Sequence, residues 1–335
     1  MKTMQHNNFT LIRLVLSTLV LFGHFKILPG GLGEGLSNYA DVAVDAFFIV
    51  SGYLVSGSID SKPSAFGFYI RRLFRLYPLY AVTIFAQAVL MLTLVPNDIA
   101  SYAGETLRYI AANLVFANFL AHDIGGVLSN LHNSGINPSL WTLKIEVGFY
   151  VLLPLIWLLT RRFGCWVLLV AFVASTMLTD YALSHDMINL SRQLPCQLRF
   201  FIVGIALYRY RHMLVLPRLQ AIVLAVLMVV LCGLRHYPLL FEIYPIALGL
   251  LLFICAFKLP TFSMKLDISY GVYLFHAPLI QLSVLMGWYH DSLPFLLLLL
   301  MAVFILAFIA EKLIERPGIA LGRYVLERWQ IGKQP

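Results

Sequence analysis

Residues 13–24 read RLVLSTLVLFGH, an unbroken apolar run that begins with Arg13 and ends with His24. An α-helix turns about 100° and rises about 1.5 Å per residue, so this run amounts to about three turns. We therefore expect Arg13 and His24 on nearly the same face, roughly 16–17 Å apart along the axis, which is about half the hydrocarbon thickness of a bilayer. Such a helix holds a permanent cation near one membrane surface and a titratable imidazole well inside.

Composition extends this interpretation to the whole chain. Of the 335 residues, 60% are hydrophobic and 12% are charged, whereas soluble domains carry about 25% charged residues. Apolar segments recur from one end to the other without a linker or an internal repeat. We therefore predict one polytopic membrane domain over residues 1–335. No A-x-A-like cleavage site follows the first apolar run, so we expect it to remain as the first membrane helix.

Ten apolar runs are long enough to cross a bilayer as helices with some tilt. An eleventh run, 107–121, is shorter and is bounded by polar residues. The ten predicted spans are 10–28, 41–57, 76–95, 139–160, 164–180, 196–210, 219–235, 242–258, 267–288 and 293–313.

The positions of Lys and Arg decide whether residues 107–121 cross. If this segment only dips into the membrane or lies at its surface, most of the 24 basic residues fall on the same side as the N-terminus. Because cytoplasmic loops carry an excess of Lys and Arg, we predict that both termini are cytoplasmic. The predicted fold is all-α: a polytopic bundle of about ten transmembrane helices plus one short interfacial or re-entrant segment.

Charge and cysteine usage exclude several other classes of function. The net charge of +8 follows from the basic inner loops, and no basic stripe with interleaved aromatic residues predicts a nucleic-acid partner. The four cysteines stand singly in apolar runs, so we expect neither a metal site nor a disulfide. The motifs GxGxxG, GxSxG and HExxH are absent as well.

Three ionisable side chains lie deep in later predicted spans, where a polar residue is costly and usually serves a site. Asp45 lies in DVAVDAFFIVSGYLVSGS, Glu146 in NPSLWTLKIEVGFYVLLPL and His276 in DISYGVYLFHAPLIQL. We expect Asp45 to pair with a histidine or arginine of a neighbouring helix. For His24 and His276, a hydrogen-bonded structural role is an equally good interpretation of the sequence.

A cluster of arginines, Arg71, Arg72 and Arg75, lies in FYIRRLFRLYPLY. Residues three and four apart are neighbours on a helix, and guanidinium groups match phosphate oxygens well. The cluster therefore predicts a phosphate site. The alternative is ordinary positive-inside topology with lipid headgroup binding.

Six sequence motifs follow one another along the chain. They are the Arg13–x10–His24 pair, AVDAFFIVSGYLVS (43–56), RRLFRLYPLY (71–80), SLWTLKIEVGFYVLLP (139–154), SYGVYLFHAP (269–278) and IERP (314–317). In this order they resemble the acyltransferase 3 family of bacterial integral-membrane O-acyltransferases, and the resemblance covers nearly the whole chain. Where many members have two adjacent acids, this chain has Glu146 followed by Val147, and Lys144 replaces a usually neutral residue.

The resemblance implies transfer of an acyl group, most often acetyl, from cytoplasmic acyl-coenzyme A to a hydroxyl of a glycan or lipid-linked saccharide. The acceptor would belong to the cell envelope or be exported, and the enzyme would be a multi-pass protein of the bacterial inner (plasma) membrane. The hydrolase-like extracellular domain fused to some members is not expected here. The acceptor, the position acylated, the length of the acyl group and the oligomeric state are not specified by the sequence.

On this resemblance we assign the donor phosphates to Arg13 and to the cluster of Arg71, Arg72 and Arg75. His24 is the expected general base, because an imidazole titrates close to neutral pH. Direct transfer and a covalent acyl-His24 intermediate are both open at this point.

Five further roles complete the expectation. Asp45 is expected to orient the imidazole ring, with Glu146 as another catalytic residue, and Trp141, Tyr273 and His276 are expected to bind the acceptor. The main alternative function is a proton-coupled transporter or flippase of a saccharide or lipid-linked precursor, in which buried acids and histidines form a proton relay. That alternative predicts inverted repeats, which the sequence does not show.

Overall fold

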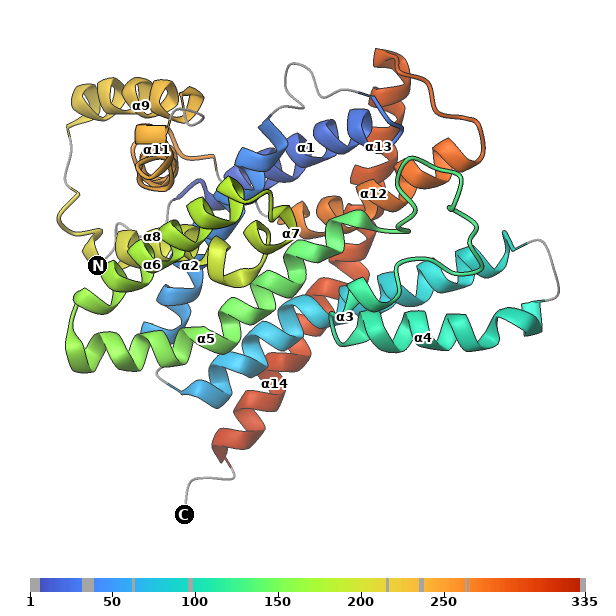
Figure 1. Cartoon of the computed structure of the whole chain (residues 1–335). Helices are drawn as coiled ribbons and strands as arrows, with labels where there is room; N and C mark the ends of the chain where they lie inside the picture. Colours follow the sequence, from blue (N-terminus) through green and yellow to red (C-terminus); the bar gives the residue numbers. More distant parts are fainter. Residues whose placement is uncertain are drawn as a thin grey trace. The chain divides into compact units, whose positions relative to one another are not determined.

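The computed structural model describes residues 7–31, 39–61, 64–95, 99–214, 217–234, 238–262, 264 and 266–331. All regular structure in these ranges is helical, and they contain no strand (Figure 1). The first six and last four residues lie outside the described residues, so the cytoplasmic placement of the termini stays a prediction.

The described helices fall into two classes by length. The longer ones are α1 (Phe9–Ile27), α2 (Ala40–Ser61), α3 (Ala65–Leu92), α4 (Ala103–Leu114), α5 (Trp141–Phe163), α6 (Trp166–Ser184), α8 (Leu194–Tyr210), α9 (Arg218–Gly233), α11 (Tyr244–Phe257), α12 (Ser269–Leu285), α13 (Leu293–Ala310) and α14 (Arg316–Ile331). The short turns are η3 (Ile99–Tyr102), η4 (Asn118–Leu120), η5 (Pro138–Leu140), α7 (Ile188–Ser191), α10 (Pro238–Phe241) and the π-helical turn η6 (Glu311–Glu315). The π-helical turn joins α13 to α14 without a break.

Each of the ten predicted spans overlaps one described helix, namely α1, α2, α3, α5, α6, α8, α9, α11, α12 and α13. Within the described ranges, six helices are long and apolar enough to cross a membrane: α1, α2, α3, α5, α6 and the continuous α13–α14. α8 and α12 have 17 residues each, the lower end of the spanning range of about 17–25 residues. The all-α fold is confirmed, and the count of about ten crossings stays a prediction.

The helix that contains the third predicted span begins earlier than the span. α3 begins at Ala65, so the arginine cluster lies inside the helix, ahead of the predicted span 76–95. Arginine lowers hydropathy but is a good helix former, which explains why an apolar pattern places the boundary too late. The guanidinium groups of the cluster are therefore fixed to a regular helix.

The eleventh apolar run, 107–121, folds differently from a single helix. α4 begins earlier, at Ala103, and ends at Leu114, because Phe116 adopts a positive φ of 61° that an α-helix does not accept. Its twelve residues extend about 18 Å, which is shorter than the hydrocarbon layer of about 30 Å.

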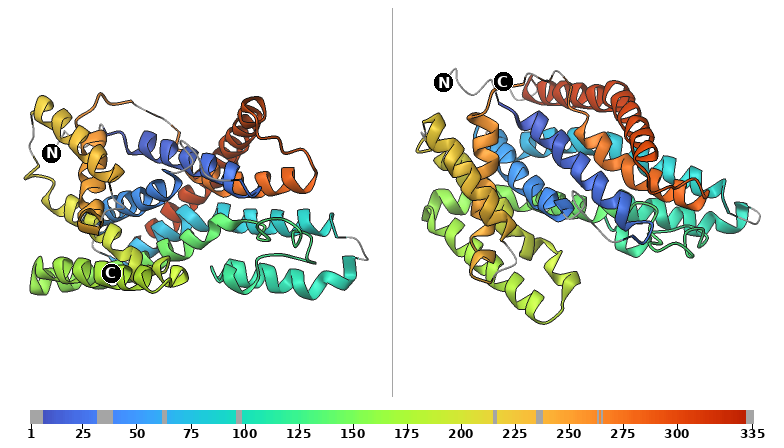
Figure 2. Two further views of the ribbon diagram at one scale, coloured as in Figure 1. Left: turned by 45° about the horizontal axis from the view of Figure 1, so that its top comes forward. Right: turned by 90° about the horizontal axis from the view of Figure 1, so that it is seen from above.

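The chain folds as two compact units, each assembled from three stretches of sequence. The first unit comprises Met1–Leu16, Val42–Phe68 and Ile145–Lys265, and the second comprises Ser17–Asp41, Tyr69–Lys144 and Leu266–Pro335. In the first unit α8 packs against α6 and α11, and α11 packs against α9; in the second, α12 packs against α13 (Figure 2). The units interleave along the sequence, and the single domain predicted for residues 1–335 stays a prediction.

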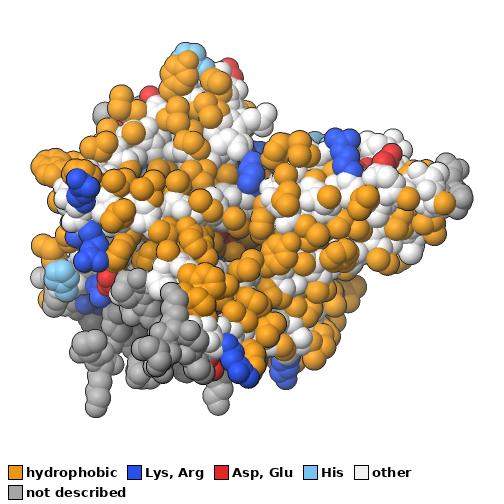
Figure 3. Space-filling view, turned by 90° about the horizontal axis from the view of Figure 1, so that it is seen from below, with side chains coloured by type: hydrophobic (Ala, Val, Ile, Leu, Met, Phe, Trp, Pro, Cys, Tyr) orange, Lys and Arg blue, Asp and Glu red, His pale blue; other side chains and the backbone are white. Residues whose placement is uncertain are grey.

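The outward side chains of the candidate spans are apolar. Val89 in α3, Val170 in α6 and Leu297 in α13 are 63%, 65% and 55% exposed. Figure 3 shows hydrophobic side chains over most of one face, with basic side chains in a few separate places. An apolar surface of this extent suits contact with lipid rather than with water.

Two glycines allow α2 and α8 to touch through their backbones. A Cβ on Gly52 would overlap the carbonyl oxygen of Phe201, and a Cβ on Gly204 would overlap the carbonyl oxygen of Ile49. Small residues at such crossings let membrane helices approach closely and pack by van der Waals contact. The SGYLVSG stretch of α2 therefore fixes the core of the first unit.

We predict that Gly204→Ala destabilises the protein, because the added methyl group forces α2 and α8 apart. Overpacking of this kind costs about 1–3 kcal/mol, measurable as a lowered midpoint of thermal unfolding in detergent. Gly233→Ala is the matched control, since a Cβ on that helical glycine has no atom within 4 Å. Equal midpoints for the two variants would contradict the proposed close packing.

Candidate active site

Two histidines from distant parts of the sequence meet in the second unit. Nδ1 of His24, on α1, lies 2.7 Å from Nε2 of His276, on α12. The ring planes are 14° apart and the ring centroids are separated by 4.9 Å. That separation is close to the N···N distance plus the radius of each ring, so the rings lie edge to edge and the contact has the geometry of a hydrogen bond.

The contacts of His276 determine the direction of this hydrogen bond. Its Nδ1 lies 3.1 Å from the carbonyl oxygen of Val272, which can only accept, so Nδ1 carries a hydrogen. In a neutral His276, Nε2 is then an acceptor, and Nδ1–H of His24 donates to it. The lone pair of a neutral His24 is consequently on Nε2, the nitrogen that faces away from His276.

The two histidine residues differ in their exposure to solvent. His276 is 0% exposed, whereas His24 is partly exposed. Of the two histidines, His24 therefore retains some exposed surface and His276 retains none.

Tyr273, one of the residues predicted to bind the acceptor, contacts both His276 and the turn at the start of α5. The ring of Tyr273 lies 5.7 Å from that of His276, and its hydroxyl lies 2.5 Å from Oγ1 of Thr142 and donates to the carbonyl of Ser139. Trp141, the first residue of α5, is partly exposed. Tyr273 thus links α12 to the turn that begins α5.

Asp45 and Glu146 both belong to the first unit. The hydroxyl of Tyr244 donates to Asp45 Oδ2 at 2.8 Å, and Asp45 interacts electrostatically with Arg199. Arg199, on α8, is of the residue type expected to pair with Asp45, and the pairing itself stays a prediction. Sequence analysis did not identify Arg199 itself, although an arginine inside the apolar run QLRFFIVGIAL is a signal of that kind.

Arg199 is held by aromatic rings as well as by charge. It is 5% exposed, and its guanidinium lies 4.8 and 4.3 Å from the ring centroids of Phe200 and Phe241. The carboxylate of Glu146 accepts hydrogen bonds from Ser51 at 3.2 Å and from the hydroxyl of Tyr150. Asp45 and Glu146, both partly exposed, therefore each have nearby donors that compensate the loss of solvent.

The arginine cluster of α3 divides into two parts. Arg75 forms ion pairs with Asp267 at 2.9 Å and with Glu315 at 3.3 Å, so a phosphate at Arg75 would compete with two carboxylates. Arg71 and Arg72 are partly exposed on the same helix. Neither acidic partner was predicted, although Asp267 directly precedes the SYGVYLFHAP motif and Glu315 lies in the IERP motif.

The described residues contain no group of three or more His, Cys, Asp and Glu side chains that could bind a metal ion.

Arg13 is partly exposed in the first part of α1, eleven residues ahead of His24 on the same helix.

Comparison with known proteins identifies the family. The sequence pattern of a family described as "Acyltransferase domain" matches residues 6–312. The chain belongs to the acyltransferase 3 family. The predicted family and the predicted class of enzyme, an acyltransferase, are therefore confirmed.

Three known proteins are similar in sequence to this acyltransferase. Nodulation protein 10 of Rhizobium leguminosarum bv. viciae is 27% identical over 316 residues, or 84% of this chain and 85% of that protein. An O-acetyl transferase of Shigella phage Sf6 is 30% identical over 164 residues, or 44% of each chain. Acyltransferase MdmB of Streptomyces mycarofaciens is 25% identical over 127 residues, or 38% of this chain and 31% of that protein. No solved structure matches the acyltransferase.

We predict that Arg75→Ala destabilises the acyltransferase, because it removes the guanidinium beside Glu315, whose carboxylate is 1% exposed. Breaking a buried pair in this way costs on the order of 3 kcal/mol, and adding Glu315→Gln should restore most of the loss. Arg323→Ala, at an exposed position of α14, is the control. Unfolding midpoints in detergent check this, and an unchanged Arg75→Ala midpoint would contradict the structural role.

Proposed function

We propose that this acyltransferase transfers an acyl group, most often acetyl, from cytoplasmic acyl-coenzyme A to a hydroxyl of a cell-envelope or exported glycan or lipid-linked saccharide. The observation that carries the proposal is the hydrogen bond between His24 and His276 inside a family of acyl-transferring enzymes. The relative named O-acetyl transferase supports oxygen as the acyl acceptor. The same proposal places the enzyme in the bacterial inner membrane with cytoplasmic termini.

His24 is the general base of the proposed reaction. Its Nε2 takes the proton of the acceptor hydroxyl while that oxygen forms its bond to the acyl carbon, and it returns the proton to the sulfur as the carbon–sulfur bond breaks. When bound, acyl-coenzyme A supplies the acyl group activated as a thioester. His24 gains a charge during this step and continues to donate from Nδ1, so the hydrogen bond to His276 also stabilises the imidazolium.

His276 is a positioning residue in this proposal rather than a direct acceptor contact. It is fully buried and is itself fixed by the carbonyl of Val272. A ring held at both nitrogens can specify both the orientation and the tautomer of its neighbour. The role of orienting the His24 ring, which the sequence analysis expected of Asp45, is in this proposal taken by the imidazole of His276 within the second unit.

Arg71 and Arg72 are proposed to bind the phosphates of the donor. Arg75 is proposed to fix the N-terminal end of α12 beside them through its ion pair with Asp267. Guanidinium groups form the paired hydrogen bonds that phosphate oxygens accept, so the residues present fit such a donor. Arg13 is proposed as a further donor contact on sequence grounds.

The remaining predicted site residues keep supporting roles in the proposal. Asp45 and Glu146 are proposed as catalytic carboxylates on the basis of their position in the family motifs and of the hydrogen bonds that they accept. Trp141 and Tyr273 are proposed to contact the acceptor, since both lie where α12 meets the start of α5.

We predict that His24→Ala lowers the rate of transfer about 10²–10⁴-fold, the usual contribution of a general base. His276→Gln should retain more activity than His276→Ala, because its amide oxygen can still accept the hydrogen bond from His24. Transfer of labelled acetyl from acetyl-coenzyme A by the purified enzyme in detergent measures both effects.

The control for these variants is His290→Ala, at an exposed position beyond α12, which should transfer at the normal rate. Normal transfer by a folded His24→Ala variant would end the general-base proposal. An acyl group found on His24 in enzyme quenched during turnover would replace direct transfer by a covalent intermediate.

We predict that Arg71→Ala and Arg72→Ala each raise the apparent KM for acetyl-coenzyme A about tenfold, with kcat nearly unchanged. The expected size is that of one lost hydrogen bond between charged groups. Arg161→Ala, at an exposed arginine near the end of α5, is the control. A change confined to the KM for the acceptor would contradict the assignment of the phosphates.

A further inference from the structure

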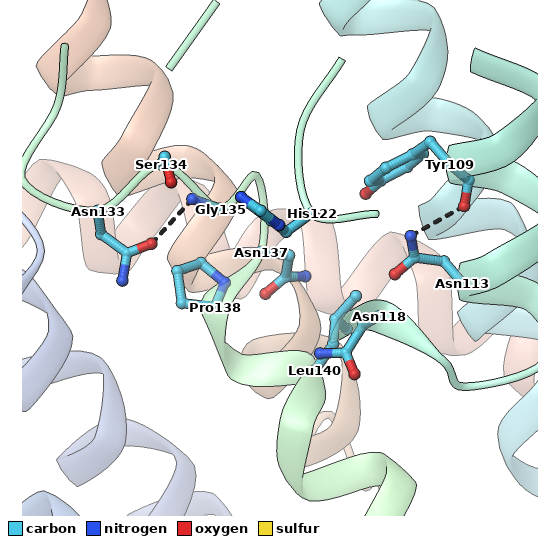
Figure 4. A pocket seen from close by; sticks show the side chains of 10 residues that line it. All are labelled: Tyr109, Asn113, Asn118, His122, Asn133, Ser134, Gly135, Asn137, Pro138 and Leu140. Carbon is cyan, nitrogen blue, oxygen red and sulfur yellow. Dashed lines mark hydrogen bonds between the residues drawn. The ribbon is translucent and has the colours of Figure 1, made fainter. Parts of the chain in front are cut away.

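A polar cavity of about 210 Å³ lies in the second unit, apart from the histidine pair. Figure 4 shows its lining, which comes from α4, from η4, from the segment between η4 and η5, and from η5 itself. At the liquid volume of about 30 Å³ per water, a space of this size holds about seven waters. It therefore suits one small polar ring rather than an extended chain.

Some of the polar side chains in this lining hold the walls together. Asn113 donates from Nδ2 to the carbonyls of Tyr109 and Ala121. Asn137 donates from Nδ2 to the carbonyl of Leu274, and its Oδ1 accepts from Ser139. These bonds give the cavity a fixed shape without the help of a ligand.

Other polar groups of the lining remain available to a ligand. Asn133 uses Oδ1 to accept from the backbone of Gly135 at 2.9 Å, which leaves Nδ2 as a donor (Figure 4). Within the described part of the chain, the side chains of Asn118, His122 and Ser134 form no hydrogen bond. Donors and acceptors are therefore presented together on a rigid wall.

The chemistry of the lining selects a neutral ligand. None of the ten residues that line the cavity is Lys, Arg, Asp or Glu. Amide and hydroxyl groups pair well with adjacent hydroxyls of a ligand, because each can donate and accept. A carboxylate or phosphate would have no permanently charged partner among these residues.

The wall of the cavity is attached to α12 on both sides of His276. Leu274, two residues before His276, accepts from Asn137, and Gln281, five residues after it, donates to the carbonyls of Asn133 and Gly135. Seven residues of helix separate these two attachments, about 10.5 Å along the axis. The cavity and the supporting imidazole thus share one rigid element.

We propose that this cavity binds an uncharged sugar unit of the acceptor, with Asn118, Asn133 and Ser134 forming hydrogen bonds to its hydroxyls. The proposal rests on the proposed function, since it names the part of the acceptor that the site recognises. It makes the cavity a determinant of acceptor specificity, selecting neutral units over acidic or cationic ones.

The test measures binding without turnover. Saturation-transfer NMR of the full-length protein in nanodiscs compares a methyl hexopyranoside with the corresponding methyl uronide and methyl 2-amino-2-deoxyhexoside, without acyl-coenzyme A. We expect a signal from the neutral probe alone. Asn118→Ala, Ser134→Ala and Asn133→Asp should each weaken its binding about three- to tenfold, the cost of one hydrogen bond.

Ser129→Ala is the matched control, because Ser129 is an exposed serine of the same segment outside the cavity. The proposal is overturned if the neutral probe gives no signal, if all three probes bind equally, or if the cavity variants bind like the control. A second measurement separates it from the proposed function. Wild-type protein that binds the neutral probe but transfers no acetyl contradicts the proposed function alone, whereas active transfer with an unchanged acceptor KM in the cavity variants contradicts the cavity alone.

Discussion

Polar groups inside a membrane-embedded bundle must pair with one another, because the hydrocarbon offers them no water. In the second unit this requirement is met along α12. Asp267, just ahead of the helix, binds Arg75 of α3, and His276 binds His24 of α1. Two residues before His276, the carbonyl of Leu274 accepts from the turn that precedes α5. Each bond attaches a different element to the same helix, so the polar interior of this unit depends on α12.

The polar contacts of α12 are spread along the helix. Arg75 is bound just ahead of α12, the imidazole pair lies about 10.5 Å further on, seven residues beyond Ser269, and the wall of the polar cavity is attached on both sides of His276, at Leu274 and Gln281.

Hydropathy was sufficient to place the helices, because each long apolar run has few ways to satisfy its backbone other than as a helix. Hydropathy did not give the ends of two helices. α3 begins at Ala65, ahead of the apolar run 76–95, and α4 ends at Leu114, inside the apolar run 107–121. For the candidate site residues, the sequence did not predict which side chains pair with one another. A sequence indicates that His24 and Asp45 each require a partner, whereas the choice of His276 or Arg199 is made by packing. The sequence did not predict that the amide side chains of Asn118 and Asn133 line a cavity, since asparagine is common in ordinary loops.

The facing nitrogens of the imidazole pair leave room for a single hydrogen between them. One extra proton can settle on the outer nitrogen of His24 without disturbing that bond. Protonation of both rings would place N–H groups on both facing atoms, and two donors 2.7 Å apart repel each other. Charging of both rings would therefore weaken the contact that joins α1 to α12.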